Sequence, residues 1–342
     1  MSDGNIPDAD RQVRTKTVGA LPLLGLAGLA GAGGWIIYSA TMIDHNMPLP
    51  LSIASERRMF DSAVAGLLNY YVDDSGEGRP LLLLHSINAA ASAYEMRPLF
   101  EEYRGRRPVY ALDLPGFGFS ERSDRYYSPE LYTGAVGDFL SGIIGEPADV
   151  IALSLSGEFA AHAATKLPEL FHSLTVISPT GLSAGAQIGS SQATVESGGS
   201  NGFLNFLRFP LWNQAFFDLL ATRISIIYFL KKSFNGPVDE GLANYAFLSA
   251  HQPGALHAPL HFVSGKLFTP NILRAVYSKL QHPGLIIYDK DPYTGFEALP
   301  DLLLSQPQWS AVRITPTRGL PQFEQLQTLR KVLDNFWQGL DQ

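Results

Sequence analysis

Short apolar runs alternate with stretches of helical spacing along most of this 342-residue chain. Each run is followed by turn residues before the helical spacing begins, which is typical of strands joined by crossover helices. We predict an amphipathic helix at 321–340 and strands at 68–72, 80–85, 109–112, 150–153, 174–177, 285–288 and 311–314. The alternation therefore predicts an α/β protein with a mostly parallel, doubly wound sheet and helices on both of its faces.

The alternation stops between residues 183 and 280. This stretch begins with small and polar residues and then becomes rich in aromatic residues, from Phe203 to Phe229. Charged residues such as Arg208 and Asp218 interrupt it, so a second membrane span is not expected. We predict an inserted helical subdomain whose aromatic residues pack on one another, line an apolar pocket or rest against a bilayer.

An apolar segment near the N-terminus is long enough to cross a membrane as a helix. Residues 18–43 contain no charged side chain, and about 20 apolar residues suffice for a span. Three basic residues precede the segment, which predicts a cytoplasmic tail at 1–17 and the large domain on the extracytoplasmic side. These residues are Arg11, Arg14 and Lys16.

Two other interpretations of this segment stay open. A cleaved signal peptide would end near Ala30-Gly31-Ala32, where small residues follow an apolar stretch. A buried helix of a soluble protein is the third interpretation. With a transmembrane helix at 18–43, residues 44–66 are predicted to be a linker that contains a short helix at 51–59.

The composition excludes several classes of function. The chain has no cysteine, so it cannot use disulfides, thiolate catalysis or cysteine-based metal sites. The net charge is −7 and no basic block follows the N-terminus, so no nucleic-acid partner is expected. His257 and His261 have the spacing of a helical metal pair, but Pro259 between them weakens the helix. We therefore expect no metal and no cofactor.

A strand that runs directly into a tight turn and a helix is predicted at Ala152-Leu153-Ser154-Leu155-Ser156-Gly157. Small residues stand two positions before and two positions after Ser154, as a sharp turn with close helix–strand packing requires. Such a turn presents its central serine at the end of the sheet, so Ser154 is the candidate nucleophile. Ser156 is a poorer candidate because Glu158 would occupy its second small position.

Three other segments accompany this turn: 83–86 (Leu-Leu-His-Ser), 113–120 (Asp-Leu-Pro-Gly-Phe-Gly-Phe-Ser) and 289–292 (Asp-Lys-Asp-Pro). In this order the segments resemble the α/β-hydrolase family, in particular the branch of proline iminopeptidases, haloalkane dehalogenases and small esterases. The resemblance covers residues 67–342 and implies that residues 183–280 form a helical lid. Segment 113–120 is a scaffold turn in that family, so we assign no chemistry to it.

The resemblance also implies roles for individual residues. Ser154 corresponds to the nucleophile and Asp291 to the acid of a catalytic triad, although Asp291 is also explained as an ordinary turn residue. His85 is interpreted as a structural histidine or, less simply, as a base. The loop after His85 and the elbow of the nucleophile supply the oxyanion amides in this family, which indicates Ser86, Ile87 and Leu155.

The chain departs from the family's pattern at the third member of the triad. Residues 315–324 (Thr-Pro-Thr-Arg-Gly-Leu-Pro-Gln-Phe-Glu) resemble the family's Gly-His-x-Pro-x-x-Glu segment, with Arg318-Gly319 where Gly-His belongs. No histidine follows Asp291, and Arg318 cannot act as the base because a guanidinium stays protonated. Gly319 therefore stands at the position of the triad histidine. The alternative bases are lid histidines, which are otherwise surface or packing residues: His251, His257 and His261.

Two functions of different classes follow from these features. The first is a membrane-anchored serine hydrolase that acts on a small ester, amide or lipid-like substrate with a degenerate triad. The second is a non-catalytic relative that uses the same pocket to bind a ligand or another protein. Both expect a small-molecule substrate or ligand and a membrane contact through residues 18–43, and neither predicts an oligomeric state.

Overall fold

The computed structural model describes residues 20–183 and 199–342, and no side chain before residue 31. Contacts divide the chain into two units, Met1–Ile43 and Asp44–Gln342, which are described separately below.

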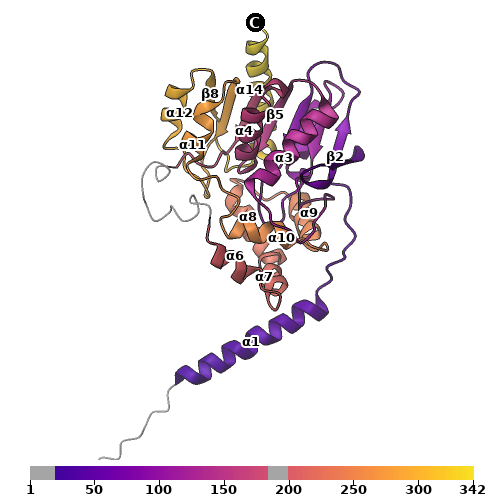
Figure 1. The fold of residues 1–342 in the computed structure, drawn as a ribbon, viewed down its shortest axis with the longest axis vertical. Helices are drawn as coiled ribbons and strands as arrows, with labels where there is room; N and C mark the ends of the chain where they lie inside the picture. The colour runs from indigo at the N-terminus through magenta and orange to yellow at the C-terminus, as the bar shows by residue number, and fades with distance from the viewer. Residues whose placement is uncertain (1–19, 184–198) are drawn as a thin grey trace, which may run out of the picture. The chain divides into compact units, whose positions relative to one another are not determined.

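The first unit contains helix α1, Ala20–Met42 (Figure 1). Of the predicted membrane segment at 18–43, residues 18 and 19 lie outside the described residues, as does the predicted tail at 1–17. Within the described part of the chain, no helix combines the length and the hydropathy that a membrane span requires.

The second unit is built on an eight-stranded sheet with the order β1-β2-β4-β3-β5-β6-β7-β8. The pairs from β4 to β8 are parallel, whereas β2 runs antiparallel to both of its neighbours. The strands are β1 Glu56–Ser62, β2 Gly66–Asp73, β3 Leu81–Leu84, β4 Val109–Leu112, β5 Ala148–Leu153, β6 Phe171–Ile177, β7 Gly284–Tyr288 and β8 Trp309–Arg313. The predicted mostly parallel sheet is therefore confirmed.

Strand β1 lies in the segment that the sequence predicts to be a linker, and the short helix predicted at 51–59 is wrong. β1 pairs with β2 along its whole length, from Glu56 opposite Val72 to Ser62 opposite Gly66. Its first residues are charged and largely exposed, as is common for a strand at the edge of a sheet. This strand is stabilised by its pairing with β2 and not by an apolar face of its own. Its sequence therefore shows little of the alternation that predicts a strand.

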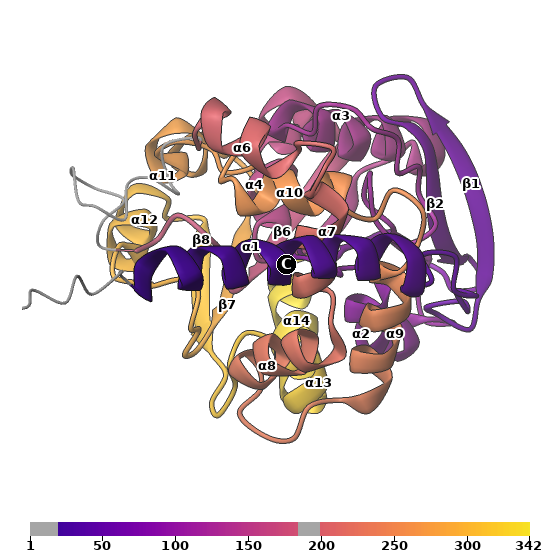
Figure 2. The ribbon, with the colours of Figure 1, turned by 90° about the horizontal axis from the view of Figure 1, so that it is seen from below.

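Helices cover both faces of the sheet, and the strands alternate between the two cores. Leu81 and Leu83 of β3 pack in one apolar cluster with α2 (Arg97–Tyr103) and α14 (Leu326–Leu340). Leu82 and Leu84 pack in the other cluster with α3 (Pro129–Phe139), α4 (Ser156–Lys166) and α12 (Leu299–Ser305). Figure 2 shows α3 and α4 on the opposite side of the sheet from α2 and α14. A strand buried on both faces reads as a continuous apolar run, as β3 does.

The helical lid gathers at one end of the sheet (Figure 1). Its helices are α6 Asn201–Leu207, α7 Asn213–Leu220, α8 Arg223–Ser233, α9 Glu240–Ala250 and α10 His257–Val263. Residues 184–198 of the predicted lid lie outside the described residues. The remaining short helices are η1 Ala93–Met96, η2 Leu140–Ile144, η3 Pro168–Leu170, α11 Ile272–Ala275, η5 Tyr277–Lys279 and α13 Pro321–Glu324.

The turn at 113–120 has a structural role. The fully buried carboxylate of Asp113 accepts hydrogen bonds from the Asn69 side chain at 2.7 Å and from the Ala93 and Phe119 amides at 2.9 and 3.0 Å. A side chain at Gly118, whose φ is 54°, would collide with this carboxylate. Asp113 thus ties the loop after β4 to β2 and to η1.

Candidate active site

Ser154 occupies the sharp turn between β5 and α4. Its φ is 56°, in the left-handed region that non-glycine residues rarely adopt. The Ser154 amide donates to the Ile177 carbonyl of β6 at 2.8 Å, and the Ser154 carbonyl accepts from the Gly157 amide at 3.0 Å. A β-carbon at Gly157 would lie 2.3 Å from a methyl group of Val176, so the helix can approach the sheet only with glycine at this position. Ala152 and Ser156 are fully buried in the same turn.

Ser154 lines a cavity of about 320 Å³ between the strand ends and the lid. Its wall is mostly apolar, with Leu153, Leu155 and Leu320 from the α/β core. The lid contributes Ile226, Phe229, Leu230, Leu242, Phe262 and Val263. An apolar pocket with a few polar groups at one end is the usual form of a small-molecule site.

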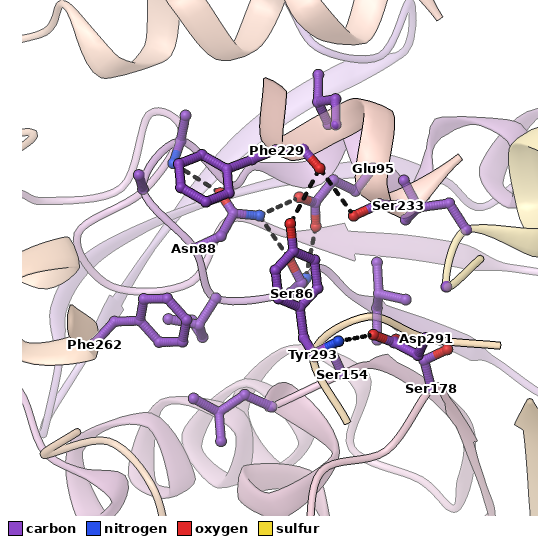
Figure 3. Close-up of a pocket in the computed structure, with 18 of the residues that line it drawn as sticks. Ser86, Asn88, Glu95, Ser154, Ser178, Phe229, Ser233, Phe262, Asp291 and Tyr293 are labelled. Carbon is purple, nitrogen blue, oxygen red and sulfur yellow. Dashed lines mark hydrogen bonds between the residues drawn. The ribbon is translucent and has the colours of Figure 1, made fainter. Parts of the chain in front are cut away.

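Asp291 lines the same cavity from the loop after β7 (Figure 3). One carboxylate oxygen accepts from the Tyr293 amide at 2.8 Å. Burial raises the pKa of Asp291 above its ordinary value, while hydrogen bonds from the Tyr293 amide, the Ser178 hydroxyl and the Thr294 amide act in the opposite direction. Figure 3 shows Ser154, Ser178 and Asp291 at the same end of the cavity.

Gly319 stands next to this carboxylate. It lies between β8 and α13, lines the cavity and has a φ of 106°. A β-carbon at this position would lie 3.0 Å from Oδ2 of Asp291 and 3.7 Å from Oγ of Ser178. A side chain at residue 319 would therefore begin against the acid, and glycine leaves that space free.

The predicted oxyanion residues all line the cavity, but their amides differ. The Ser86 amide donates to Oε2 of Glu95 at 2.8 Å and is therefore occupied. The amides of Ile87 and Leu155 have no hydrogen-bond partner among the residues that the structure describes. Two unpaired amides at the strand ends are the kind of donor that stabilises a developing oxyanion.

Glu95 is a second carboxyl in the cavity wall, and sequence reasoning did not identify it. It is buried in η1, and its other carboxylate oxygen accepts from the Asn88 side chain at 2.8 Å. Burial raises the pKa of Glu95, against the hydrogen bonds from Ser86 and Asn88. Ser178 is also missed, although its place directly after β6 is a signal, because side chains at the carboxyl ends of parallel strands meet at one edge.

His85 is a structural residue in this fold. Its Nε2 accepts from the Leu114 amide at 2.9 Å, so Nδ1 carries the proton and donates to the Ser86 carbonyl at 2.6 Å. Burial lowers the pKa of His85 to about 4, which keeps the ring neutral. Both ring nitrogens are occupied, so His85 has no free nitrogen for a proton transfer.

The structure does not bring the three lid histidines to the cavity. His251 pairs through Nδ1 with the Phe247 carbonyl at 2.7 Å, and His261 pairs in the same way with the His257 carbonyl at 2.8 Å. His257 contacts Asp124 at 3.4 Å. All eight histidines of the chain are among the described residues, and none of them lines the cavity. In the same described part, no cluster of three acidic or histidine side chains is arranged to hold a metal ion.

Comparisons with known proteins agree with this geometry. A model of the alpha/beta hydrolase family matches residues 81–326, which include the elbow, the acid loop and Gly319. Among curated proteins, the chain is 30% identical over 122 residues to a 2-hydroxymuconate semialdehyde hydrolase of Pseudomonas sp. (strain CF600). It is 29% identical over 110 residues to a pimeloyl-[acyl-carrier protein] methyl ester esterase of Chromobacterium violaceum.

These alignments cover 35% and 32% of this chain, and only 43% and 41% of the relatives' length. A solved structure of a membrane phospholipase A, a bacterial virulence factor, superposes with a TM-score of 0.65 and 18% identity. That superposition covers 94% of this chain and 98% of the phospholipase, and at this identity it shows a shared fold. The fold, the strand-end elbow and the family match together show that the chain belongs to the alpha/beta hydrolase family.

Proposed function

We propose that the cavity is a hydrolase-type acyl-transfer site in which Ser154 is the nucleophile and the chain's own general base is missing. The observation that carries the proposal is the left-handed turn that holds Ser154 at the cavity wall. A fold keeps a strained residue when its surroundings require the conformation, and strained residues cluster at active sites. The unpaired Ile87 and Leu155 amides supply donors for the oxyanion, and Asp291 takes the position of the triad acid.

Turnover by such a site is slow. A serine hydroxyl is a weak nucleophile at neutral pH unless a neighbouring base accepts its proton. No histidine lines this cavity, and Gly319, the residue that the sequence resemblance aligns with the triad histidine, lies beside Asp291. Oxyanion donors and substrate binding alone retain roughly 10³–10⁴-fold acceleration over the reaction in water.

The substrate class that fits best is a small ester, amide or lipid-like acyl compound. The wall is formed mainly by leucine, phenylalanine and alanine side chains, which suits an apolar acyl chain. The proteins named above include a curated pimeloyl-[acyl-carrier protein] methyl ester esterase and, as a shared fold, a membrane phospholipase A.

Covalent labelling tests this proposal. The full chain is treated with a fluorophosphonate probe, which bonds to activated serines, and the rate of labelling is followed for the wild type and for Ser154→Ala. We expect slow labelling that Ser154→Ala abolishes. Ser278→Ala is the control, because this serine donates to the Arg274 carbonyl, is not among the residues that line the cavity, and should leave labelling unchanged. Equal labelling of the wild type and of Ser154→Ala would contradict the assignment of the nucleophile.

A second function, ligand binding without turnover, is favoured by one observation. Residue 319 is a glycine, so it supplies no imidazole to Asp291, and no histidine lines the cavity. Complete absence of labelling in a well-folded protein would replace the hydrolase proposal with this one.

We propose separately that residues 18–43 tether the domain to a membrane with the N-terminus in the cytoplasm. The support is the uncharged sequence of this segment and the basic residues before it. Leu26→Arg places a charge in the middle of the segment and should release the full chain from alkali-washed membranes, whereas Leu26→Ala should not. Equal retention of both variants would contradict a hydrophobic tether.

A further inference from the structure

The charged groups of the cavity wall all have the same sign. Glu95 and Asp291 line the cavity, and no lysine, arginine or histidine is among the described residues that line it. The rest of the wall is apolar apart from hydroxyl groups and the Asn88 amide. A carboxylate in apolar surroundings costs free energy unless a cation or several donors accompany it.

Asp291 has neutral donors only. Its hydrogen-bond donors are backbone amides and the Ser178 hydroxyl, and it forms no ion pair with the described residues. Asp289, on the same loop, is a carboxylate that does form an ion pair. It accepts from Nε of Arg313 at 2.7 Å and from the Thr317 amide at 2.9 Å. Asp291, which is half-buried, therefore has no cation among the described residues, whereas the buried Asp289 has one.

Free space adjoins this acid on the cavity side. Gly319 has no side chain, and a β-carbon there would lie 3.0 Å from Oδ2 of Asp291 and 3.7 Å from the Ser178 hydroxyl oxygen. Asp291, Ser178 and Gly319 all line the cavity, so a ligand nitrogen in the cavity could approach the Asp291 carboxylate past Gly319 without meeting a side chain at residue 319. Aromatic rings of Phe262 and Tyr293 line the same cavity and can attract a cation through their faces or pack against an apolar group, whereas Lys232 already lies over the ring of Phe229.

We propose that the cavity binds a ligand with an apolar body and one protonated amine, and that the amine occupies the space beside Gly319 and pairs with Asp291. The apolar wall of the lid holds the body of the ligand, and the carboxylate holds its ammonium group. The inference rests on the proposed function, because it assigns a substrate or ligand class to the same cavity. It makes the ligand, rather than the protein, the source of the cationic partner that Asp291 lacks.

Binding of matched ligands tests the inference. Hexylamine, hexan-1-ol and hexanoate share one apolar body and differ in the charge of the head group. Their dissociation constants are measured by calorimetry on the full chain carrying Ser154→Ala, in which the proposed nucleophile is absent. We expect hexylamine to bind about tenfold more tightly than hexan-1-ol, as one charge-assisted hydrogen bond provides, and hexanoate to bind most weakly.

Two conservative variants locate the amine. Asp291→Asn in the same background should remove the preference for hexylamine over hexan-1-ol, whereas Glu95→Gln should preserve it. Asp301→Asn, on the exposed side of α12, is the control for a general loss of negative charge. Equal affinity for the amine and the alcohol, or a preference that Glu95→Gln removes and Asp291→Asn does not, would overturn the inference. Because binding is measured without Ser154, failure here leaves the labelling result untouched, and failure of labelling leaves this result untouched.

Discussion

The loops after β7 and β8 follow neighbouring strands, yet they prepare the cavity in opposite ways. The loop after β7 places a carboxylate, Asp291, in the cavity wall with hydrogen bonds that fix its position. The loop after β8 places Gly319, which has no functional group, directly beside that carboxylate. Under the proposed function, the elbow and the acid loop keep the form of an acyl-transfer site although the next loop supplies no base, because the sheet positions both of them.

The largest expected effect comes from returning an imidazole to the second loop. We expect Gly319→His to raise Ser154-dependent hydrolysis of p-nitrophenyl butyrate by about 100-fold, the lower end of what a positioned general base contributes. The φ of 106° strains any side chain here, so the variant should lose about 1–2 kcal/mol of unfolding free energy.

Gly339→His is the matched control for this gain, because a β-carbon at Gly339 meets no atom within 4 Å. A folded Gly319→His protein with the rate of the wild type would show that residue 319 does not stand at the position of a base.

The two aspartates of the first loop should respond differently to removal of their charge. Asp289→Asn breaks the ion pair with Arg313 and is expected to cost about 2 kcal/mol of unfolding free energy, as for a buried hydrogen bond to a charged group. Asp291→Asn removes a carboxylate that has no cation and should change stability by less than about 0.5 kcal/mol. Urea unfolding of both variants measures the difference, and equal losses would contradict it.

The pH dependence of stability separates the same two carboxyls. Burial raises the pKa of Asp291 in the folded state. Above this raised pKa the ionised carboxylate lowers the stability of the folded protein. The loss disappears as the pH falls through the raised pKa and the carboxyl becomes protonated. The wild type should therefore gain stability relative to Asp291→Asn on acidification. Burial also acts to raise the pKa of Asp289, but hydrogen bonds from Thr317 and Arg313 outweigh it and lower the pKa. Its contribution is present above the unfolded pKa and is lost as the pH falls through the lowered folded value.

Other titrating groups lie in or beside the wall of the same cavity and need a matched comparison. Tyr293 and Glu95 line the same cavity, and Lys232 of α8 lies over the ring of Phe229. These groups are present in the wild type and in each asparagine variant. The unfolding free energy of the wild type minus that of one variant therefore reports the contribution of the one carboxyl that the variant lacks. Parallel pH profiles for Asp289→Asn and Asp291→Asn would contradict the assigned directions.

A smaller effect than that of Asp289→Asn is expected at the outer partner of the ion pair. Arg313 is 53% exposed, and a half-exposed cation contributes about 0–1 kcal/mol to stability. Arg313→Gln should therefore cost less than Asp289→Asn, and added salt should reduce its cost further. A loss as large as that of Asp289→Asn would show that the pair, and not the amide of Thr317, fixes the loop.

Much of the sheet and of the cavity's end could be predicted from the sequence. Ser154 follows from a local turn that requires small neighbours, and Asp291 and Gly319 follow from short segments after strands. Strand β1 could not be predicted, because its stability depends on pairing with β2 rather than on its own residues. Glu95 could not be predicted either, because only the tertiary fold brings this helical glutamate to the Ser86 amide.

The contacts of the lid histidines could not be predicted from the sequence either, because they depend on residues that the fold brings together. The sequence places His251, His257 and His261 in the lid, but it does not define which face of the lid turns toward Ser154. In the fold, each of these side chains pairs with a backbone carbonyl or a surface acid instead.

Rescue by free imidazole tests most directly whether Ser154 is a nucleophile without a base. Hydrolysis of p-nitrophenyl butyrate is measured for the full chain with and without added imidazole, and for Ser154→Ala under the same conditions. We predict that imidazole raises the rate of the wild type roughly tenfold over its effect on Ser154→Ala, because it can enter the cavity beside Asp291 and accept the serine proton. The same increase in both proteins would contradict the account.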